Sequence, residues 1–283
     1  MTGSLILSAL LAVVIGTWNG NWFPSGRAEH RAHPDVEDAT ITAAARMLAE
    51  GLNAVDPAGT NDVIICLNEI RGPSAASNLI ARIGRPGLRV VAVSGYRRRD
   101  RFDQQQDVIA TTLSVAGSSW SRWRNSGSVT PPRGYAFAEI VFSAAVTANV
   151  YAVHLKSNYG ATTPEIKAAN SEKRLNAITQ IIKQERPKRG KAKRPVILAG
   201  DMNADRWRKE FADEKLFPAL DEAGFTNPLA ELPADSRGTH PSRRYGDSAL
   251  DYIFLRGIKA SAQPKIIPND NLSDHYALFV VAD

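Results

Sequence analysis

The sequence predicts a layered α/β protein in which two β-sheets pack together. Many short apolar runs rich in Val and Ile have the length of strands, and longer segments with the apolar spacing of helices lie between some of them. The chain has 283 residues, of which 43% are hydrophobic and 23% are charged. This composition supports a sizeable core, and one large domain is expected.

Strands are predicted from nine apolar runs, and helices from three segments whose apolar residues recur three or four positions apart. In the first helical segment, Val36, Ala39, Ala43 and Met47 fall on one face. The strands are expected at residues 12–17, 63–67, 88–93, 108–115, 136–142, 148–154, 196–199, 250–255 and 277–281, and the helices at residues 35–50, 163–185 and 211–223.

An apolar N-terminal segment, residues 1–14, precedes the domain expected at residues 15–283. Its apolar run is too short to span a bilayer, so no transmembrane helix is expected. The segment is either a secretory signal peptide or the start of the first strand. No Lys or Arg precedes the run, and the run continues without a gap into the predicted strand. Both features disfavour a signal peptide. Secreted, periplasmic and cytoplasmic locations all stay open.

The charge balance favours a polyanionic partner. Lys and Arg total 35 against 29 Asp and Glu, which gives a net charge of +6 and a pI near 9.5. This signal gains weight only beside a phosphate chemistry, because many basic proteins bind no nucleic acid. The single cysteine, Cys66, lies in an apolar run and is expected to be a buried thiol without a disulfide. No feature demands a dimer, so a monomer is the default.

Polar residues cluster near the carboxyl ends of predicted strands, where side chains from separate strands converge on one cleft. Each cluster alone is a weak signal, because a sequence such as Gly-Asp-x-Asn also forms simple turns. Six clusters follow one another at residues 17–22, 67–70, 153–157, 200–204, 250–254 and 272–275.

In this order, the six clusters resemble the motifs of the endonuclease/exonuclease/phosphatase superfamily. The resemblance runs from about Ile15 to the C-terminus. It implies a four-layer α/β/β/α sandwich of two mixed β-sheets packed face to face, with the active site at one end. It also implies a metal-dependent phosphodiesterase in which water attacks in a single step, with no covalent intermediate.

The resemblance also implies a metal site. Phosphodiester hydrolysis requires a hard divalent cation, an activated water and donors for the negative charge that develops. Mg²⁺ prefers oxygen ligands and keeps waters, so one or two carboxylates suffice, and Mn²⁺ or Ca²⁺ are alternatives. Glu69 matches the family's metal ligand, Asn19 matches an amide that supports the metal, and Asp274 matches a carboxylate that binds or faces the cation.

Four further residues match the family's catalytic groups. Asp201 is implied to orient or deprotonate the attacking water, and Asn203 to donate to the phosphate oxygen. They are two positions apart, so on an extended segment they point to the same side. Asp251 and His275 form a carboxylate–imidazole pair if their strands adjoin, and that pair suits His275 to acid–base work or to clamping the phosphate.

His154 closes a predicted strand and resembles the second histidine of the pancreatic deoxyribonuclease and sphingomyelinase branches, which assists protonation of the leaving group. Its carboxylate partner is open, with Gln105, Gln106 and Asp107 in the right stretch. Two positions depart from the family pattern. Asn68 stands where Gln usually precedes the metal-binding Glu, and Ala277 stands where Pro commonly follows the terminal motif.

The expected substrate is DNA or another nucleic acid. A Ser/Gly-rich stretch mixes indole rings with guanidinium groups, which stack on bases and grip phosphates. An equally weighted alternative is that one of its Trp side chains packs in the core. The candidate contacts are Arg97, Arg99, Trp120, Arg122, Trp123 and Arg124. Two other functions stay open: a sphingomyelinase or inositol-phosphate phosphatase of the same fold, and a family member that binds nucleic acid without catalysis.

Overall fold

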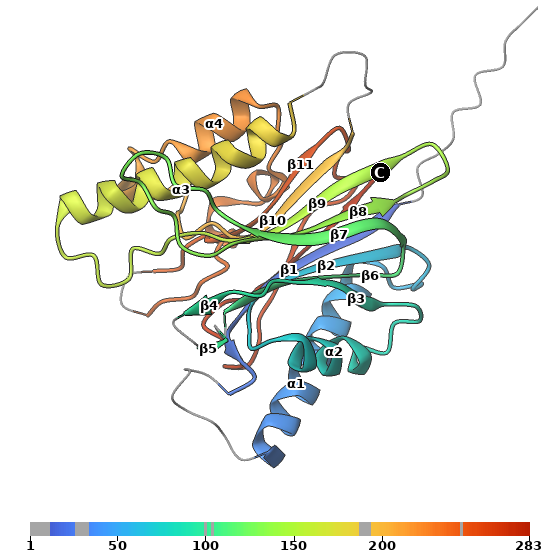
Figure 1. The fold of residues 1–283 in the computed structure, drawn as a ribbon. Helices are drawn as coiled ribbons and strands as arrows, with labels where there is room; N and C mark the ends of the chain where they lie inside the picture. Colours follow the sequence, from blue (N-terminus) through green and yellow to red (C-terminus); the bar gives the residue numbers. More distant parts are fainter. Residues whose placement is uncertain (1–11, 26–33, 99–100, 103–104, 187–193, 244–245) are drawn as a thin grey trace, which may run out of the picture.

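Two mixed β-sheets pack face to face at the centre of the molecule, and helices cover their outer faces (Figure 1). The computed structural model describes residues 12–25, 34–98, 101–102, 105–186, 194–243 and 246–283. The predicted α/β/β/α sandwich is confirmed. Most of the N-terminal segment discussed above, and Arg99, lie outside the described residues. Within the described ranges, no helix is both long and apolar enough to cross a membrane.

The first sheet has six strands in the order β12-β13-β1-β2-β6-β3. Its central pair, β1 and β2, is parallel, and β13 runs antiparallel to β1 on the other side. The chain therefore adds its last strand beside its first. The strands are β1 (Val13–Phe23), β2 (Asp62–Ile70), β3 (Arg89–Val93), β6 (Gln106–Thr111), β12 (Lys265–Ile267) and β13 (Ala277–Ala282).

The second sheet has five strands in the order β11-β10-β9-β8-β7. β9 and β10 are parallel, whereas the other neighbours are antiparallel. All five come from one continuous stretch of chain: β7 (Ser114–Arg122), β8 (Gly134–Val141), β9 (Thr147–His154), β10 (Val196–Asp201) and β11 (Asp251–Arg256). A separate two-stranded sheet pairs β4 (Arg97–Arg98) with β5 (Arg101–Phe102).

Each sheet carries helices on the face turned away from the other sheet (Figure 1). The first sheet is covered by α1 (Pro34–Val55) and α2 (Pro73–Arg82), and the second by α3 (Pro164–Gln184) and α4 (Leu216–Glu222). Thr163 caps α3, because its side chain accepts a hydrogen bond from the N–H of Ile166, and Pro164 occupies the first turn. Three short 3-10 helices, η1 (Lys209–Phe211), η2 (Pro228–Glu231) and η3 (Ala234–Ser236), lie in the connections.

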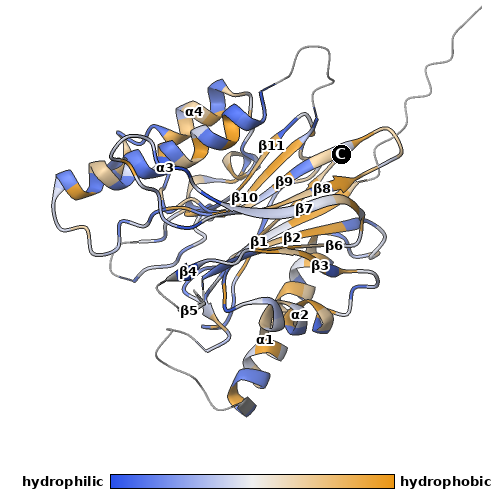
Figure 2. Cartoon of the chain, viewed as in Figure 1, coloured by the Kyte–Doolittle hydropathy of each residue, from blue (hydrophilic) through white to orange (hydrophobic). Residues whose placement is uncertain are grey.

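Alternating side chains of β1 divide the core into two parts. Val13 and Ile15 pack between the sheets, whereas Val14 and Trp18 pack against the helices of the first sheet. This period of two follows from strand geometry. In Figure 2 the strands carry mostly hydrophobic colours, whereas α1 and α3 carry both hydrophobic and hydrophilic colours. Cys66 is buried and unpaired, as predicted.

Two of the predicted elements had wrong boundaries. Residues 108–115 were expected as one strand, but Thr112 and Leu113 separate β6 from β7, and the chain passes there from the first sheet to the second. Residues 211–223 were expected as one helix, but only Leu216–Glu222 is α-helical, after the turn η1. The short helix α2 and the short strand β12 were not predicted.

Candidate active site

The six polar clusters meet at one end of the sandwich. In the second sheet, Asp201 lies opposite His154 on one neighbouring strand and opposite Asp251 on the other. In the first sheet, Asn19 lies opposite Asn68, next to Glu69. A hydrogen bond joins the two sheets here, since Asn19 Nδ2 donates to Asp201 Oδ2 at 2.9 Å, and the same group donates within the first sheet to Glu69 Oε1 at 3.3 Å.

Asp201 is the centre of this cluster. Its carboxylate accepts from the backbone N–H of Asn203 at 2.7 Å, from Asn203 Nδ2 at 2.9 Å, and from Asn19. Burial disfavours the charged carboxylate and raises the pKa of Asp201 to about 7, although the cationic His275 opposes this rise and Asp251 adds to it. A carboxyl with a pKa near neutrality suits a general base.

Both hydrogens of the Asn203 side-chain amide are used in hydrogen bonds to neighbouring residues. The two hydrogens of its amide go to Asp201 Oδ2 and to the carbonyl of Leu155, the latter at 3.2 Å. Its backbone has a positive φ of 52°, and Glu69 has a φ of 57°. These values cost free energy for residues other than Gly and cluster at functional sites in proteins. In this arrangement Asn203 orients Asp201, and donation to a phosphate requires one of the two bonds to be exchanged.

His275 forms the predicted pair with Asp251. Its Nδ1 lies 2.7 Å from Asp251 Oδ2, and the hydroxyl of Thr239 donates to the same oxygen at 2.8 Å. Burial acts to lower the pKa of His275, but the carboxylates of Asp251 and Asp201 outweigh it and raise the pKa to about 10. His275 is therefore a cation at neutral pH, with Nε2 3.9 Å from Asp201 Oδ2.

His154 has a different environment. Its Nε2 lies 3.6 Å from both Glu69 Oε1 and Asp201 Oδ2, and its Nδ1 has no hydrogen-bond partner among the residues that the structure describes. Burial, together with the charges of Arg133, His275 and Lys156, lowers the pKa of His154 well below its usual value. A neutral His154 is suited to hydrogen bonding rather than to delivering a proton.

The candidates for partner of His154 have other roles. Asp107 accepts from Asn68 Nδ2 and from the hydroxyl of Tyr96. Gln105 accepts from Arg133, whose guanidinium also donates to the carbonyls of His154 and Leu155. The carboxylates nearest to the imidazole in the described contacts are thus Glu69 and Asp201, which sequence spacing did not indicate.

The three predicted metal-site residues separate into a buried pair and a rim residue. Glu69 and Asn19 are in direct contact, and Glu69 Oε2 is buried without a hydrogen-bond partner in the described parts of the chain. A buried carboxylate oxygen with no donor is what a bound cation would satisfy, so the oxygen-rich set fits a hard divalent ion. Asp274 is about half exposed, with ion-pair distances of 3.8 Å to His240 and 3.9 Å to His275.

His240 is a site residue that the sequence did not reveal. Its ring lies edge-on to that of His275 at a centroid distance of 4.8 Å, and His240, Asp274 and His275 together have the spacing of a metal-binding group. Backbone hydrogen bonds with Ser248 hold it there. Its immediate sequence neighbours are not acidic, and its segment reaches the site because the N–H of Tyr276, next to His275, donates to the carbonyl of Thr239.

The expected nucleic-acid contacts lie along β7 and beside it. Trp120 is 41% exposed and packs edge-on against Tyr96, over which the Arg122 guanidinium also lies. Arg122 donates to the carbonyl of Arg97, so these residues form one surface. Here we call Arg97, Trp120 and Arg122 the Trp120 surface.

The prediction that Trp123 contacts nucleic acid was wrong. Its ring is buried against Tyr135 in the core, so it is not available to stack on a base. The alternative that one Trp of this stretch packs in the core therefore applies. Arg124 is exposed, and its backbone N–H and carbonyl are both hydrogen-bonded to the side chain of Gln180 on α3.

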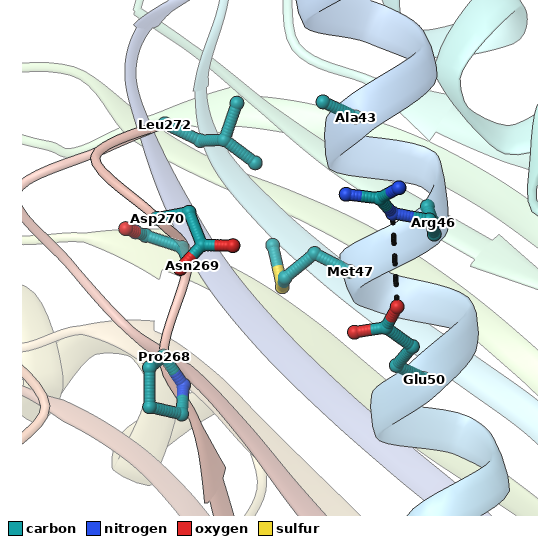
Figure 3. A pocket seen from close by; sticks show the side chains of 8 residues that line it. All are labelled: Ala43, Arg46, Met47, Glu50, Pro268, Asn269, Asp270 and Leu272. Atoms are coloured by element: carbon teal, nitrogen blue, oxygen red, sulfur yellow. Dashed lines mark ion pairs between the residues drawn. The ribbon is translucent and has the colours of Figure 1, made fainter.

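A small cavity of about 120 Å³ lies between α1 and residues 268–272 (Figure 3). An ion pair between Arg46 and Glu50 borders it. None of the predicted site residues lines it. Asn269, which does, donates to the carbonyls of Ser273 and His275 and so supports the last motif from behind.

Comparisons with known proteins agree with this fold. The model of the endonuclease/exonuclease/phosphatase family matches residues 16–275. A search of curated proteins finds no match.

Among solved structures, an endonuclease/exonuclease/phosphatase family protein from Leptotrichia buccalis has a TM-score of 0.64 at 16% identity, covering 95% of this chain and 98% of that one. TDP2 from D. rerio, complexed with a single-strand DNA product, has a TM-score of 0.62 at 16% identity, with coverage of 96% and 99%. The human Nocturnin catalytic domain with bound sulfate has a TM-score of 0.62 at 14% identity, with coverage of 96% and 94%. At these identities the similarity establishes the fold.

Proposed function

Because the chain belongs to the endonuclease/exonuclease/phosphatase family, we propose that it is a deoxyribonuclease that hydrolyses internal phosphodiester bonds of DNA with the help of a divalent metal ion. Members of this family are hydrolases that act on phosphodiester bonds, and they generally depend on divalent metals. The observation that carries the proposal is the buried Asp201, which hydrogen bonds hold in place between two histidines and beside Glu69.

Glu69 would hold the metal ion through its Oε2, Asn19 would support the site by donating to Glu69 Oε1, and Asp274 would face the ion from the rim. Mg²⁺ is the proposed ion, and Mn²⁺ or Ca²⁺ would fit the same oxygen ligands. When bound, such an ion neutralises the phosphate and lowers the pKa of a coordinated water.

The protein groups divide the remaining work. Asp201 accepts the proton of the attacking water, because burial has brought its pKa close to neutrality. His275, held as a cation by Asp251, clamps a negative phosphate oxygen as charge builds up there. His154, kept neutral by burial, donates a hydrogen bond to the leaving oxygen. Asn203 keeps Asp201 in its reactive orientation.

DNA is the proposed substrate because the Trp120 surface combines an exposed indole ring with guanidinium groups, and the chain as a whole is basic. A neighbour of the same fold, TDP2 from D. rerio, has been solved with a single-strand DNA product. That likeness supports the choice of nucleic acid over a lipid headgroup.

The test is nicking of supercoiled plasmid in Mg²⁺, Mn²⁺ or EDTA, with sphingomyelin and an inositol phosphate assayed beside it. We expect metal-dependent nicking that Glu69→Gln, His154→Ala and Asp201→Asn each reduce. Asp201→Asn should lower kcat about 10²- to 10⁴-fold, since it removes the general base. The exposed Glu50→Gln on α1 is the matched control and should leave the rate unchanged. Turnover of the lipid or inositol substrate alone would move the protein to another branch of the family, and metal-independent DNA binding without any turnover would leave it a binding protein.

A further inference from the structure

Asp107 is a fully buried carboxyl that the proposed reaction does not use. It lies on β6, in the first sheet, beneath the active site. Asn68 Nδ2 donates to its Oδ1 at 2.8 Å, and the hydroxyl of Tyr96 donates to its Oδ2 at 2.9 Å. Burying a carboxyl costs free energy of folding, and its hydrogen bonds have to offset that cost.

We propose that Asp107 is a positioning residue that orients the amide of Asn68, through which it holds Asp201 in place. This inference rests on the role proposed above for Asp201. The side-chain amide of Asn68 bonds at both ends. Its Nδ2 donates to Asp107, and its Oδ1 accepts a hydrogen bond from the backbone N–H of Asp201 at 3.1 Å.

Asp107 selects this orientation of the amide. An amide group has a donor end and an acceptor end, and turning it over exchanges them. In the turned-over form, the oxygen of Asn68 would face the carboxyl of Asp107, and its NH₂ group would face the N–H of Asp201. Both contacts would be repulsive, so a carboxylate at position 107 excludes the wrong orientation.

The link crosses from one sheet to the other. Asn68 belongs to β2 of the first sheet, and Asp201 ends β10 of the second. The close approach depends on Gly200, which has a φ of 137°. A Cβ atom there would lie 2.8 Å from Asn68 Oδ1 and 2.0 Å from the carbonyl oxygen of Val153. Asn68 thus fixes the backbone of Asp201, while Asn19 and Asn203 fix its carboxylate.

Tyr96 provides a matched control within the same cluster. It binds the other oxygen of Asp107, so Tyr96→Phe removes one hydrogen bond from the carboxyl and leaves the bond to Asn68 in place. If Asp107 acts through Asn68, Tyr96→Phe should have no effect on turnover. If Asp107 only stabilises the core, both of its partners should matter alike.

The experiment compares kcat and KM for plasmid nicking in Asp107→Leu, Asp107→Asn, Asn68→Ala, Tyr96→Phe and the double variant Asn68→Ala/Asp107→Leu, with the folded fraction measured by circular dichroism at the assay temperature. We expect Asp107→Leu and Asn68→Ala each to lower kcat about 10- to 100-fold at unchanged KM. The double variant should lose no more than either single one. Asp107→Asn keeps an oxygen for the Asn68 amide and should stay within a few-fold of wild type. Wild-type turnover in Asp107→Leu, or a full additional loss in the double variant, would overturn the inference.

A second readout separates this inference from the proposed function. The backbone amide resonance of Asp201 reports its hydrogen bond directly, and it should move in Asp107→Leu and Asn68→Ala but not in Tyr96→Phe. A protein that hydrolyses none of the substrates would defeat the proposed function, while the resonance would still decide the positioning role. An unmoved Asp201 resonance in a folded Asp107→Leu protein would defeat the positioning role alone.

Discussion

Backbone strain in this protein coincides with the residues proposed for catalysis. Glu69 and Asn203 both have positive φ values, and neither is a residue that adopts them without cost. Each such residue costs on the order of 1–3 kcal/mol, which the surrounding packing has to offset. Glu69 also leaves a carboxylate oxygen without a donor in the described structure. Backbone strain and a buried oxygen without a donor at one residue are what the proposed cation site at Glu69 would be expected to show.

Activity should depend on pH through Asp201. Burial raises the pKa of this carboxyl to about 7, and a general base works only when it is deprotonated. We therefore expect kcat/KM to increase as pH rises from 5 and to level off near or below pH 7, because a bound cation nearby favours the carboxylate. Rates across pH 5–9 at saturating Mg²⁺ would show this, and a rate that falls between pH 5 and 7 would contradict the role.

Most of the site could be predicted at the level of residues, because motif residues near strand ends are recognisable in order along the chain. Asn19, Glu69, His154, Asp201, Asn203, Asp251 and His275 lie in one cluster in the structure. The residues missed are those whose role depends on distant pairing. His240 reaches the site because the N–H of Tyr276, next to His275, donates to the carbonyl of Thr239, and Asp107 turns to Asn68 rather than to His154 because β6 adjoins β2.

At the scale of elements, the passage from β6 to β7 was the main error of prediction. The apolar run continues through it, so sequence periodicity gives no sign that the chain leaves one sheet and enters the other. β7 is an edge strand with mostly exposed side chains, whose Ser and Gly residues are typical of a loop. Trp120 lies on this strand and is exposed, whereas Trp123 lies just after it and is buried.

These two tryptophans should respond differently to truncation. Trp120→Ala should weaken DNA binding by about 1–3 kcal/mol if a base stacks on the ring, and should lower the unfolding free energy by only about 0.5–1.5 kcal/mol through the lost contact with Tyr96. Trp123→Ala should lower the unfolding free energy by about 3–5 kcal/mol, because it leaves a cavity in the core. Fluorescence anisotropy with a labelled single strand and urea unfolding distinguish the two. Equal DNA affinity for wild type and Trp120→Ala would remove the Trp120 surface from the proposal.

On the scale of the whole molecule, the site is assembled from both sheets. Asn19 and Glu69 come from the first sheet, and His154, Asp201 and Asp251 from the second. Any change in the packing of one sheet on the other changes these distances. The site and the sandwich are thus expected to form and to be lost together.

Metal binding should therefore stabilise the whole fold. A ligand at 100 times its Kd adds about 2.7 kcal/mol to the unfolding free energy when it binds only the folded state. We expect Mg²⁺ to raise Tm in wild type, EDTA to reverse the rise, and Glu69→Gln to abolish it, all measurable by differential scanning calorimetry. The Glu50→Gln control should respond to Mg²⁺ as wild type does. A Tm that rises equally in Glu69→Gln would place the metal elsewhere.

The position of β13 has a consequence for synthesis of the protein. The central strand β1 is translated well before its partner β13, which begins two residues after His275. Until that strand arrives, one edge of β1 is open and the cationic group proposed to clamp the phosphate is missing. We therefore expect a growing chain that has not yet been translated through β13 to lack the proposed nuclease activity.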